Sequence, residues 1–138
     1  GQSERFSIAS FSNQISKIVQ LKQDPVIEVG DLSTTRDFTD VRDIVDAYWL
    51  ILEHGKMGEI YNVCSGTERK ISFVLEKLIH LSNKIIDVKI DSNRLRGSEQ
   101  QRIFGSAKKL EEDTGWKPRI DFEETLEDML NYFLQKEI

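Results

Sequence analysis

An arginine and several aspartates lie at the start of one expected helix, and this arrangement suits recognition of an anion. Arg36 stands shortly before Asp40, which we expect to cap a helix that begins at Val41. Main-chain amides and the helix dipole favour negative charge at such a start. The planar guanidinium of arginine can donate two parallel hydrogen bonds to a phosphate. Arg36 is therefore a candidate phosphate ligand. The alternative is an ion pair with Asp37 or Asp40 that only holds the loop.

A second group of candidate anion ligands lies in the irregular segment 92–102. It contains Arg94, Arg96 and Arg102, which make it a second possible phosphate clamp, although a solvated arginine loop explains these residues without any ligand. Ser65 and Gly66 follow an expected strand, where main-chain amides can approach a ligand closely. A plain turn explains these two small residues equally well.

Residues for redox catalysis are not recognisable in this sequence. A dinucleotide site needs a glycine-rich turn between a strand and a helix, and no such motif occurs here. Tyr132 and Lys136 have the Tyr-x-x-x-Lys spacing, in which lysine lowers the tyrosine pKa for proton transfer. They fall at the end of the last expected helix, where residues at this spacing simply share a face. We therefore predict no catalytic residue and no cofactor-binding residue in this chain. Trp116 is interpreted as a core residue.

Composition limits the possible functions further. The 138 residues, 38% of them apolar and 31% charged, indicate one folded domain. A net charge of −5 disfavours nucleic-acid binding, although a local basic cluster can still bind a small anion. Cys64 is the only cysteine, and His54 and His80 have no metal-ligand spacing, so we expect neither a disulfide nor a metal site. No signal peptide or membrane-spanning apolar run is recognisable, and we expect a cytoplasmic protein without membrane contact.

Hydrophobic periodicity predicts the elements that position these residues. Asp43 falls in the first turn of the helix capped by Asp40, where its charge favours the positive helix end. The apolar stripe of this helix is wide, so we expect it to be covered on more than one side. The expected helices lie near 8–19, 41–54, 70–82, 106–114 and 122–133, and the expected strands at 26–29, 59–64 and 86–90. The strand at 59–64 should be buried, and that at 86–90 should have one wet face. Such alternation argues for an α/β unit, with too few strands for a full doubly wound sheet.

Four short motifs occur here in the order in which they occur in extended short-chain dehydrogenase/reductases acting on nucleotide sugars. They are RDFTDV at 36–41, YNVCSG at 61–66, RLRGSE at 94–99 and GWKP at 115–118. Over nearly its whole length, the chain resembles the C-terminal part of these enzymes. Segments 29–31 and 99–106 make it most similar to the GDP-4-keto-6-deoxy-D-mannose reductases, with the GDP-mannose 4,6-dehydratases as close neighbours. Phe38 and Asp40 stand where the dehydratases more often carry tryptophan and histidine.

The resemblance implies a fold and a domain assignment. Residues 1–138 would form a small mixed α-β substrate-binding domain plus the last strands and helices of a Rossmann-type fold. The N-terminal dinucleotide-binding part would be missing. NAD(P) is expected as cofactor of the full enzyme, with none bound by this chain alone, and a GDP-sugar is expected as ligand.

The same resemblance implies a set of substrate-binding residues, namely Gln14, Ile27, Val29, Arg36, Arg96 and Glu99. The two arginines would contact the diphosphate, and Glu99 would contact the ribose or orient Arg96. Ile27 and Val29 would lie by the base, largely through their main chain, and Gln14 would face the nucleotide. Gly97 replaces a proline that the family often carries after the second arginine, which would loosen this loop.

The implied reaction is hydride transfer from a nicotinamide to the C4 ketone of the sugar, with a tyrosine donating the proton. The residues for that step would lie in the N-terminal part, so this chain would bind substrate and be inactive alone. A dehydratase (lyase) or epimerase part is the alternative within the superfamily, and a non-catalytic adaptor domain is the alternative outside it. We also expect self-association, because apolar surface that packs on the missing part would be exposed.

Overall fold

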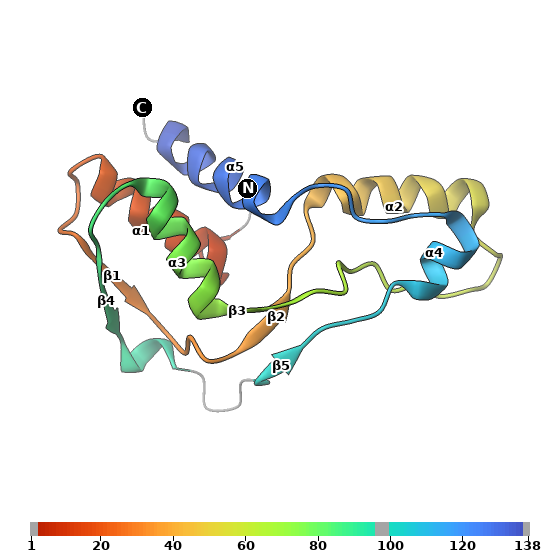
Figure 1. The fold of residues 1–138 in the computed structure, drawn as a ribbon, viewed down its shortest axis with the longest axis horizontal. Coiled ribbons are helices and arrows are strands. Elements are labelled where there is room, and N and C mark those ends of the chain that lie inside the picture. Colours follow the sequence, from red (N-terminus) through yellow and green to blue (C-terminus); the bar gives the residue numbers. More distant parts are fainter. Residues whose placement is uncertain (1–2, 96–99, 137–138) are drawn as a thin grey trace. The chain divides into compact units, whose positions relative to one another are not determined.

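The structure, a computed structural model, describes residues 3–95 and 100–136 (Figure 1). Its contacts divide the chain into two compact units. The first combines Gly1–Thr34, Lys70–Gln101 and Glu123–Ile138, and the second combines Thr35–Arg69 and Arg102–Phe122. Elements follow in the order α1 (Ser7–Val19), β1 (Val26–Val29), β2 (Thr35–Asp37), α2 (Val41–His54), β3 (Glu68–Lys70), α3 (Ile71–Ser82), β4 (Asp87–Ile90), a 3-10 turn η1 (Ser92–Arg94), β5 (Arg102–Ile103), α4 (Lys108–Thr114) and α5 (Phe122–Lys136). The predicted α/β class is confirmed.

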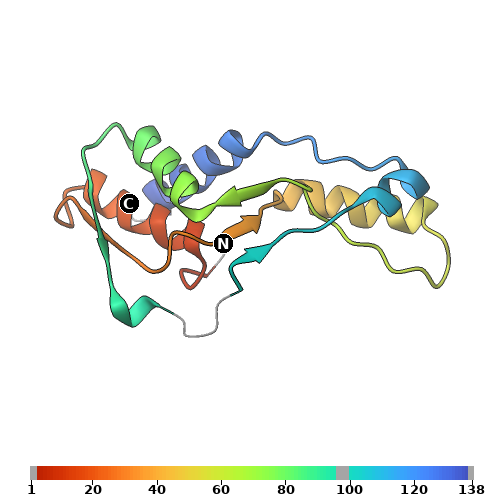
Figure 2. The same ribbon diagram turned by 60° about the horizontal axis from the view of Figure 1, so that its bottom comes forward.

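The first unit packs helices against a short parallel sheet. Helix α1 contacts both α3 and β1, and Figures 1 and 2 show α1 and α3 side by side. Strands β1 and β4 pair in parallel, with Val26 opposite Asp87 and Val29 opposite Ile90. Alternate residues of a strand share one face, so the side chains of Ile27 and Val29 are buried together in the core. The core of this unit contains Ile8, Phe11, Ile15, Ile18, Ile27, Val29, Val74, Leu75, Leu78, Leu126, Leu130 and Phe133.

Strand β4 differs from its sequence prediction. The alternation of apolar and charged residues was expected to give one dry face, yet all of β4 is exposed. Val88 is 44% and Ile90 is 63% accessible, whereas Ile86, just before the strand, is buried. In the described residues the sheet has only β1 beside β4, so β4 is an edge strand, while α1 packs on β1.

The second unit is built on a three-stranded sheet in the order β3-β2-β5. Strand β5 pairs with β2 in parallel, with Thr35 opposite Arg102 and Arg36 opposite Ile103. The core consists of Ala47 from α2, Leu110 from α4 and the nearly inaccessible Trp116. The indole Nε1 of Trp116 donates to the main-chain oxygen of Asp43 at 3.0 Å, which confirms the core interpretation.

Two expectations for the second unit are wrong. Helix α2 buries only Asp43 and Ala47 in this structure, because α4 and the loop after it cover one side alone. Its large apolar residues Val41, Val45, Tyr48, Trp49 and Leu52 are exposed. Residues 59–64 form no strand, and Ile60 is exposed. Among the described residues, no helix has the length and apolarity needed to cross a membrane.

Candidate functional site

The start of α2 has the capping geometry that its sequence predicts. Asp40 precedes the helix in an extended conformation, and its carboxylate accepts from the main-chain N of Arg42 at 2.8 Å. The Arg42 guanidinium also binds this carboxylate through Nε and Nη2, each at 2.9 Å. The Asp40 carboxylate therefore caps α2 and binds the Arg42 guanidinium at the same time. Arg36 lies on the central strand β2, where its Nη1 donates to the Thr35 oxygen at 2.7 Å.

Asp37, beside Arg36, joins the first two sequence motifs. Its carboxylate accepts from the Ser65 main-chain N at 3.0 Å, the Ser65 hydroxyl at 2.6 Å and the Gly66 N at 2.9 Å. Gly66 has a φ of 70°, a conformation that favours glycine. The two amides that were candidates for a ligand thus bind a carboxylate of this chain, which favours the turn interpretation.

The described arginines of segment 92–102, the second group of candidate anion ligands, are held by acidic neighbours. Arg102 Nε lies 2.7 Å from both oxygens of Glu68, and the Thr35 hydroxyl donates to the same carboxylate. The hydroxyl of Thr35, then the guanidinium of Arg102, lower the pKa of Glu68 below its ordinary 4.5. Arg94 forms an ion pair with Asp91 at 3.5 Å. Arg96 and Glu99, the other two predicted ligands of this region, lie outside the described residues.

The side-chain amide of Gln14 forms two hydrogen bonds with the main chain of strand β1. Its Nε2 donates to the Glu28 oxygen at 3.0 Å, and its Oε1 accepts from the Glu28 N at 2.9 Å. On either side of Glu28, the side chains of Ile27 and Val29 are buried in the core. The main chain of Ile27 and Val29 faces the neighbouring strand β4, where the Val29 oxygen accepts from Asp91 N at 2.9 Å. Their role beside a nucleotide base stays a prediction.

A polar groove of about 620 Å³ lies beside Gln14 in the first unit. Its volume falls in the range of small-molecule sites. It is lined by Glu4, Ser10, Asn13, Gln14, Lys17, Gln23, Asp24, Val26, Glu28 and Arg94. The groove brings together two residues that the sequence singled out, Gln14 and Arg94, and adds Lys17, which sequence reasoning missed. Helical spacing from Ser10 to Gln14 and Lys17 was the signal that places them on one face.

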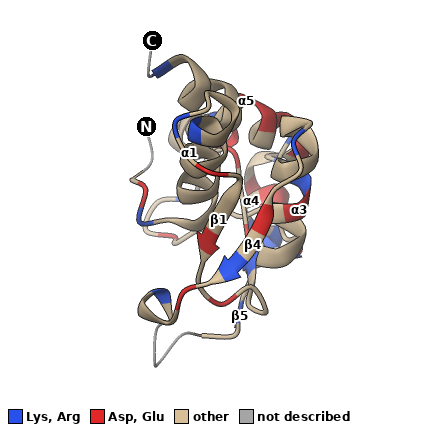
Figure 3. Ribbon diagram, turned by 90° about the vertical axis from the view of Figure 1, so that its left-hand side faces the viewer, with Lys and Arg blue, Asp and Glu red and all other residues tan. Residues whose placement is uncertain are grey.

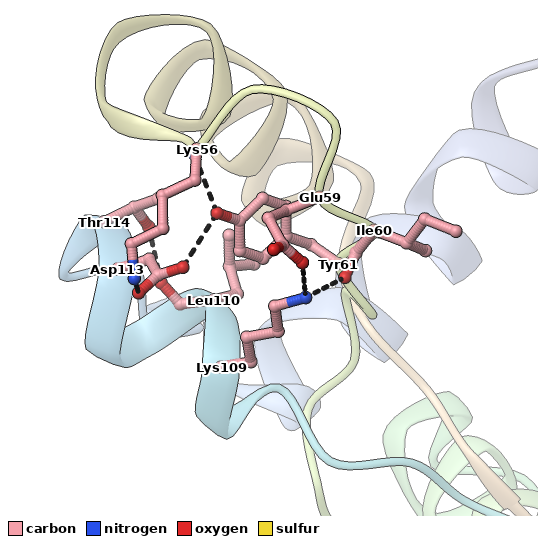
Figure 4. Close-up of polar contacts among 8 residues, drawn as sticks. All are labelled: Lys56, Glu59, Ile60, Tyr61, Lys109, Leu110, Asp113 and Thr114. Atoms are coloured by element: carbon pink, nitrogen blue, oxygen red, sulfur yellow. Dashed lines mark hydrogen bonds and ion pairs between the residues drawn. The ribbon is translucent and has the colours of Figure 1, made fainter.

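Tyr61, from the second motif, holds a loop against α4 (Figure 4). Its hydroxyl donates to Asp113 at 2.8 Å and accepts from the main-chain N of Lys56 at 2.9 Å. The Lys56 ammonium binds Asp113 at 2.5 Å, which raises the pKa of Lys56. Hydrogen bonds from Lys56 and then Tyr61 lower the pKa of Asp113. Lys109 donates to the Ile60 oxygen at 3.1 Å nearby. This cluster holds the 56–61 loop against α4.

Two further sets of reactive groups noted in the sequence are Cys64 and the Tyr132–Lys136 pair. Burial, then the charge of Asp37, raises the pKa of the Cys64 thiol, so the thiol stays protonated near neutral pH. The Lys136 ammonium lies 6.0 Å from the Tyr132 ring centroid, in the last turns of α5. No cluster of His, Cys, Asp or Glu suited to a metal ion occurs in the described part of the chain.

Comparison with known proteins identifies relatives of this arrangement. A family described as GDP-mannose 4,6 dehydratase matches residues 1–129. The GDP-6-deoxy-D-mannose reductase of Pseudomonas aeruginosa is 41% identical over 131 residues, which cover 95% of this chain and 43% of the reductase. The human GDP-mannose 4,6 dehydratase is 24% identical, with 91% of this chain and 38% of the dehydratase covered.

Solved structures give the same result. The structure of RMD from Pseudomonas aeruginosa complexed with NADPH matches with a TM-score of 0.92 and 39% identity, covering 99% of this chain and 45% of that one. A putative epimerase from Burkholderia cenocepacia matches with a TM-score of 0.82 and 32% identity, covering 97% and 43%. The chain thus spans less than half the length of these relatives, and it matches a C-terminal part of Rossmann-type enzymes.

Proposed function

The chain belongs to the GDP-mannose 4,6 dehydratase family, and on this premise we propose that it is the substrate-binding part of a nucleotide-sugar reductase. The expected substrate is GDP-4-keto-6-deoxy-mannose, reduced at C4 to a GDP-6-deoxyhexose. The observation that carries the proposal is the 41% identity to a GDP-6-deoxy-D-mannose reductase across 95% of the chain. The identity to the dehydratases is much lower, at 24–25%.

In this proposal the chain binds the nucleotide diphosphate and does not carry out the chemistry. Arg36 and Arg96 contact the diphosphate, and Glu99 contacts the ribose or orients Arg96. Gln14 lies beside the groove of the first unit and borders the nucleotide. Glu28, whose main chain Gln14 holds, also lines this groove, so Gln14 contributes by fixing the groove wall as well.

The nicotinamide cofactor is proposed to bind to another part of the functional enzyme. The related RMD structure contains NADPH, and this chain covers 45% of that protein. The exposed apolar residues of α2, together with Ile60, are the surface that we propose packs on the cofactor-binding part. The nicotinamide that transfers the hydride and the side chain that donates the proton would then both lie outside this chain.

A chimera tests the proposal directly. We would replace the matching segment of the Pseudomonas aeruginosa reductase by this chain and measure NADPH oxidation with GDP-4-keto-6-deoxy-mannose. We expect a folded chimera to reduce this substrate. Arg36→Ala should raise KM at least tenfold, since charge-assisted bonds to phosphate are lost. Arg119→Ala, which changes an exposed arginine of the same unit, is the matched control and should leave KM unchanged.

The outcomes separate the function from the role of the arginine. A chimera that melts cooperatively yet reduces no GDP-sugar would contradict the proposed function. An active chimera whose KM is equal in Arg36→Ala and Arg119→Ala would keep the function but remove Arg36 from the diphosphate site. If the chimera reduced a UDP-linked analogue with the same kcat/KM as the GDP-linked substrate, the proposed specificity for GDP would be wrong.

A further inference from the structure

The two edges of the β1-β4 sheet are unlike each other. On β1, the outward main-chain groups are occupied by glutamine side chains. Gln14 bonds both the N and the O of Glu28, and Gln23 Nε2 donates to the Val26 oxygen at 2.8 Å. These side chains take the place of a further strand. The edge of β1 is therefore closed to strand pairing.

The edge of β4 carries main-chain groups that face away from β1. Asp87 N bonds the Pro25 oxygen and Asp91 N bonds the Val29 oxygen, both at 2.9 Å. In a parallel ladder alternate residues bond the same neighbour, so the main chain of Val88 and Ile90 points outward. No other strand of the described residues pairs with β4. The accessible edge is thus a ready template for another strand.

The charges along this edge are complementary to those of a second, antiparallel copy of the same strand. The sequence from Ile86 to Ile90 is Ile-Asp-Val-Lys-Ile, with charges of opposite sign on either side of Val88. Figure 3 shows both an acidic and a basic stretch on the β4 ribbon. The carboxylate of Asp87 and the ammonium of Lys89 are both on exposed residues of this strand, where a second chain can reach them.

We propose that β4 pairs with β4 of a second copy of this chain, antiparallel and with the two-fold axis at Val88. In this register Val88 faces Val88 of the second copy, and the outward amides and carbonyls of both strands bond each other. Asp87 lies opposite Lys89 of the second copy, and Lys89 lies opposite its Asp87. Opposite residues in such a pair are about 4.5–5.5 Å apart, so both charge pairs are within reach.

The apolar side chains of β4 also favour pairing with a second copy of this strand. Ile86, Val88 and Ile90 share the face opposite the charges, and the last two are 44% and 63% accessible. The paired strands would form one continuous apolar ribbon from both copies. A four-residue edge buries less than the roughly 1,000 Å² of a stable interface, so we expect a concentration-dependent equilibrium between monomer and dimer.

Charge reversal tests the register. Lys89→Asp places a second carboxylate opposite Asp87 of the other copy, and Asp87→Lys places two ammonium groups together. Sedimentation-equilibrium measurements over a concentration series should show each single variant dimerising about tenfold more weakly. The double variant Asp87→Lys/Lys89→Asp restores both pairs and should dimerise like the original chain. An equimolar mixture of the two single variants should form a heterodimer, because one strand then carries two carboxylates and the facing strand carries two ammonium groups.

A main-chain variant and a surface control complete the design. Val88→Pro removes an outward N–H that β1 does not use, so it should abolish dimers while the far-UV circular dichroism is kept. Leu52→Asp, on the exposed face of α2, should leave this equilibrium unchanged. The proposal is overturned by a chain that stays monomeric at millimolar concentration, or by dimers that survive both single reversals. It is equally overturned by dimers that Leu52→Asp alone removes.

Discussion

Replacement of Asp43 distinguishes two roles for a carboxylate in the first turn of α2. The sequence assigns this residue to the helix dipole. In the structure its side chain is nearly inaccessible, and its oxygens accept from the main-chain N atoms of Arg119 at 3.0 Å and Ile120 at 3.2 Å. A dipole interaction contributes about 0.3–1 kcal/mol. A hydrogen bond to a charged group contributes about 1.5–3 kcal/mol.

The two roles predict different magnitudes for two variants. If Asp43 only favours the helix dipole, Asp43→Asn and Asp43→Ala should each lower the free energy of unfolding by less than about 1 kcal/mol. If it anchors the 119–120 loop, Asp43→Ala leaves two amides without an acceptor and should cost about 3 kcal/mol. Asp43→Asn keeps one acceptor oxygen and should cost about half of that.

Urea unfolding followed by circular dichroism measures these differences. Asp46→Asn is the matched control, because Asp46 is an exposed aspartate on the same helix, and it should change stability by less than about 0.5 kcal/mol. Hydrogen exchange gives an independent readout, since the Arg119 and Ile120 amides should lose protection in Asp43→Ala. Equal and small costs for both variants, with exchange at these amides unchanged, would refute the anchoring role.

Three further predictions concern other local features. Leu21 follows α1 with a φ of 60°, which strains a residue that has a Cβ, and its side chain is 87% accessible. Leu21→Gly should therefore raise the free energy of unfolding in urea by about 1 kcal/mol. A lower free energy of unfolding would contradict backbone strain at this position. A Cβ at Gly105 would lie 2.9 Å from the Cys64 Sγ. Gly105→Ala should therefore cost about 1–3 kcal/mol, and Cys64→Ala in the same chain should recover part of this; an additive double variant would exclude the contact. The lowered pKa of Glu68 means that its contribution to stability is present above the ordinary pKa of 4.5 and is lost as pH falls through the folded-state value. Glu68→Gln should flatten the acid side of the stability–pH curve, and an unchanged acid slope would show that the Thr35 and Arg102 contacts are weak in solution.

The helices were predictable from sequence because their signals are local. Helical spacing gave α1, α3 and α5 nearly to their ends, and the cap at Asp40 was correct. Strands β2, β3 and β5 were missed, since they are two or three residues long and mostly charged, as in Glu68–Lys70. Only pairing with distant segments makes them strands, and a single sequence does not contain that information.

The candidate site shows the same limit at the level of side chains. Arg36 was placed correctly just before the capped helix, because the cap is readable from neighbouring residues. The partners of Asp37, Gln14 and Asp43 were not predictable, since each binds main-chain groups far away in the sequence. A buried acceptor must find donors, but the sequence does not say which ones.

Apolar periodicity also predicts that a face must be covered without saying which chain covers it. The stripe of α2 and the alternation in β4 were both correct as patterns, and both were wrong as predictions of burial within this chain. Burying one large aliphatic or aromatic side chain stabilises by about 1.5–3 kcal/mol, so exposed stripes such as Tyr48 and Trp49 keep that free energy available for association. The two stripes differ in what they can select. The α2 stripe carries no charged side chain and can pack on any matching apolar surface. Strand β4 adds Asp87 and Lys89, which lie opposite each other when two copies of the strand pair antiparallel. This is why the charge-swap variants can separate pairing through β4 from apolar association through α2.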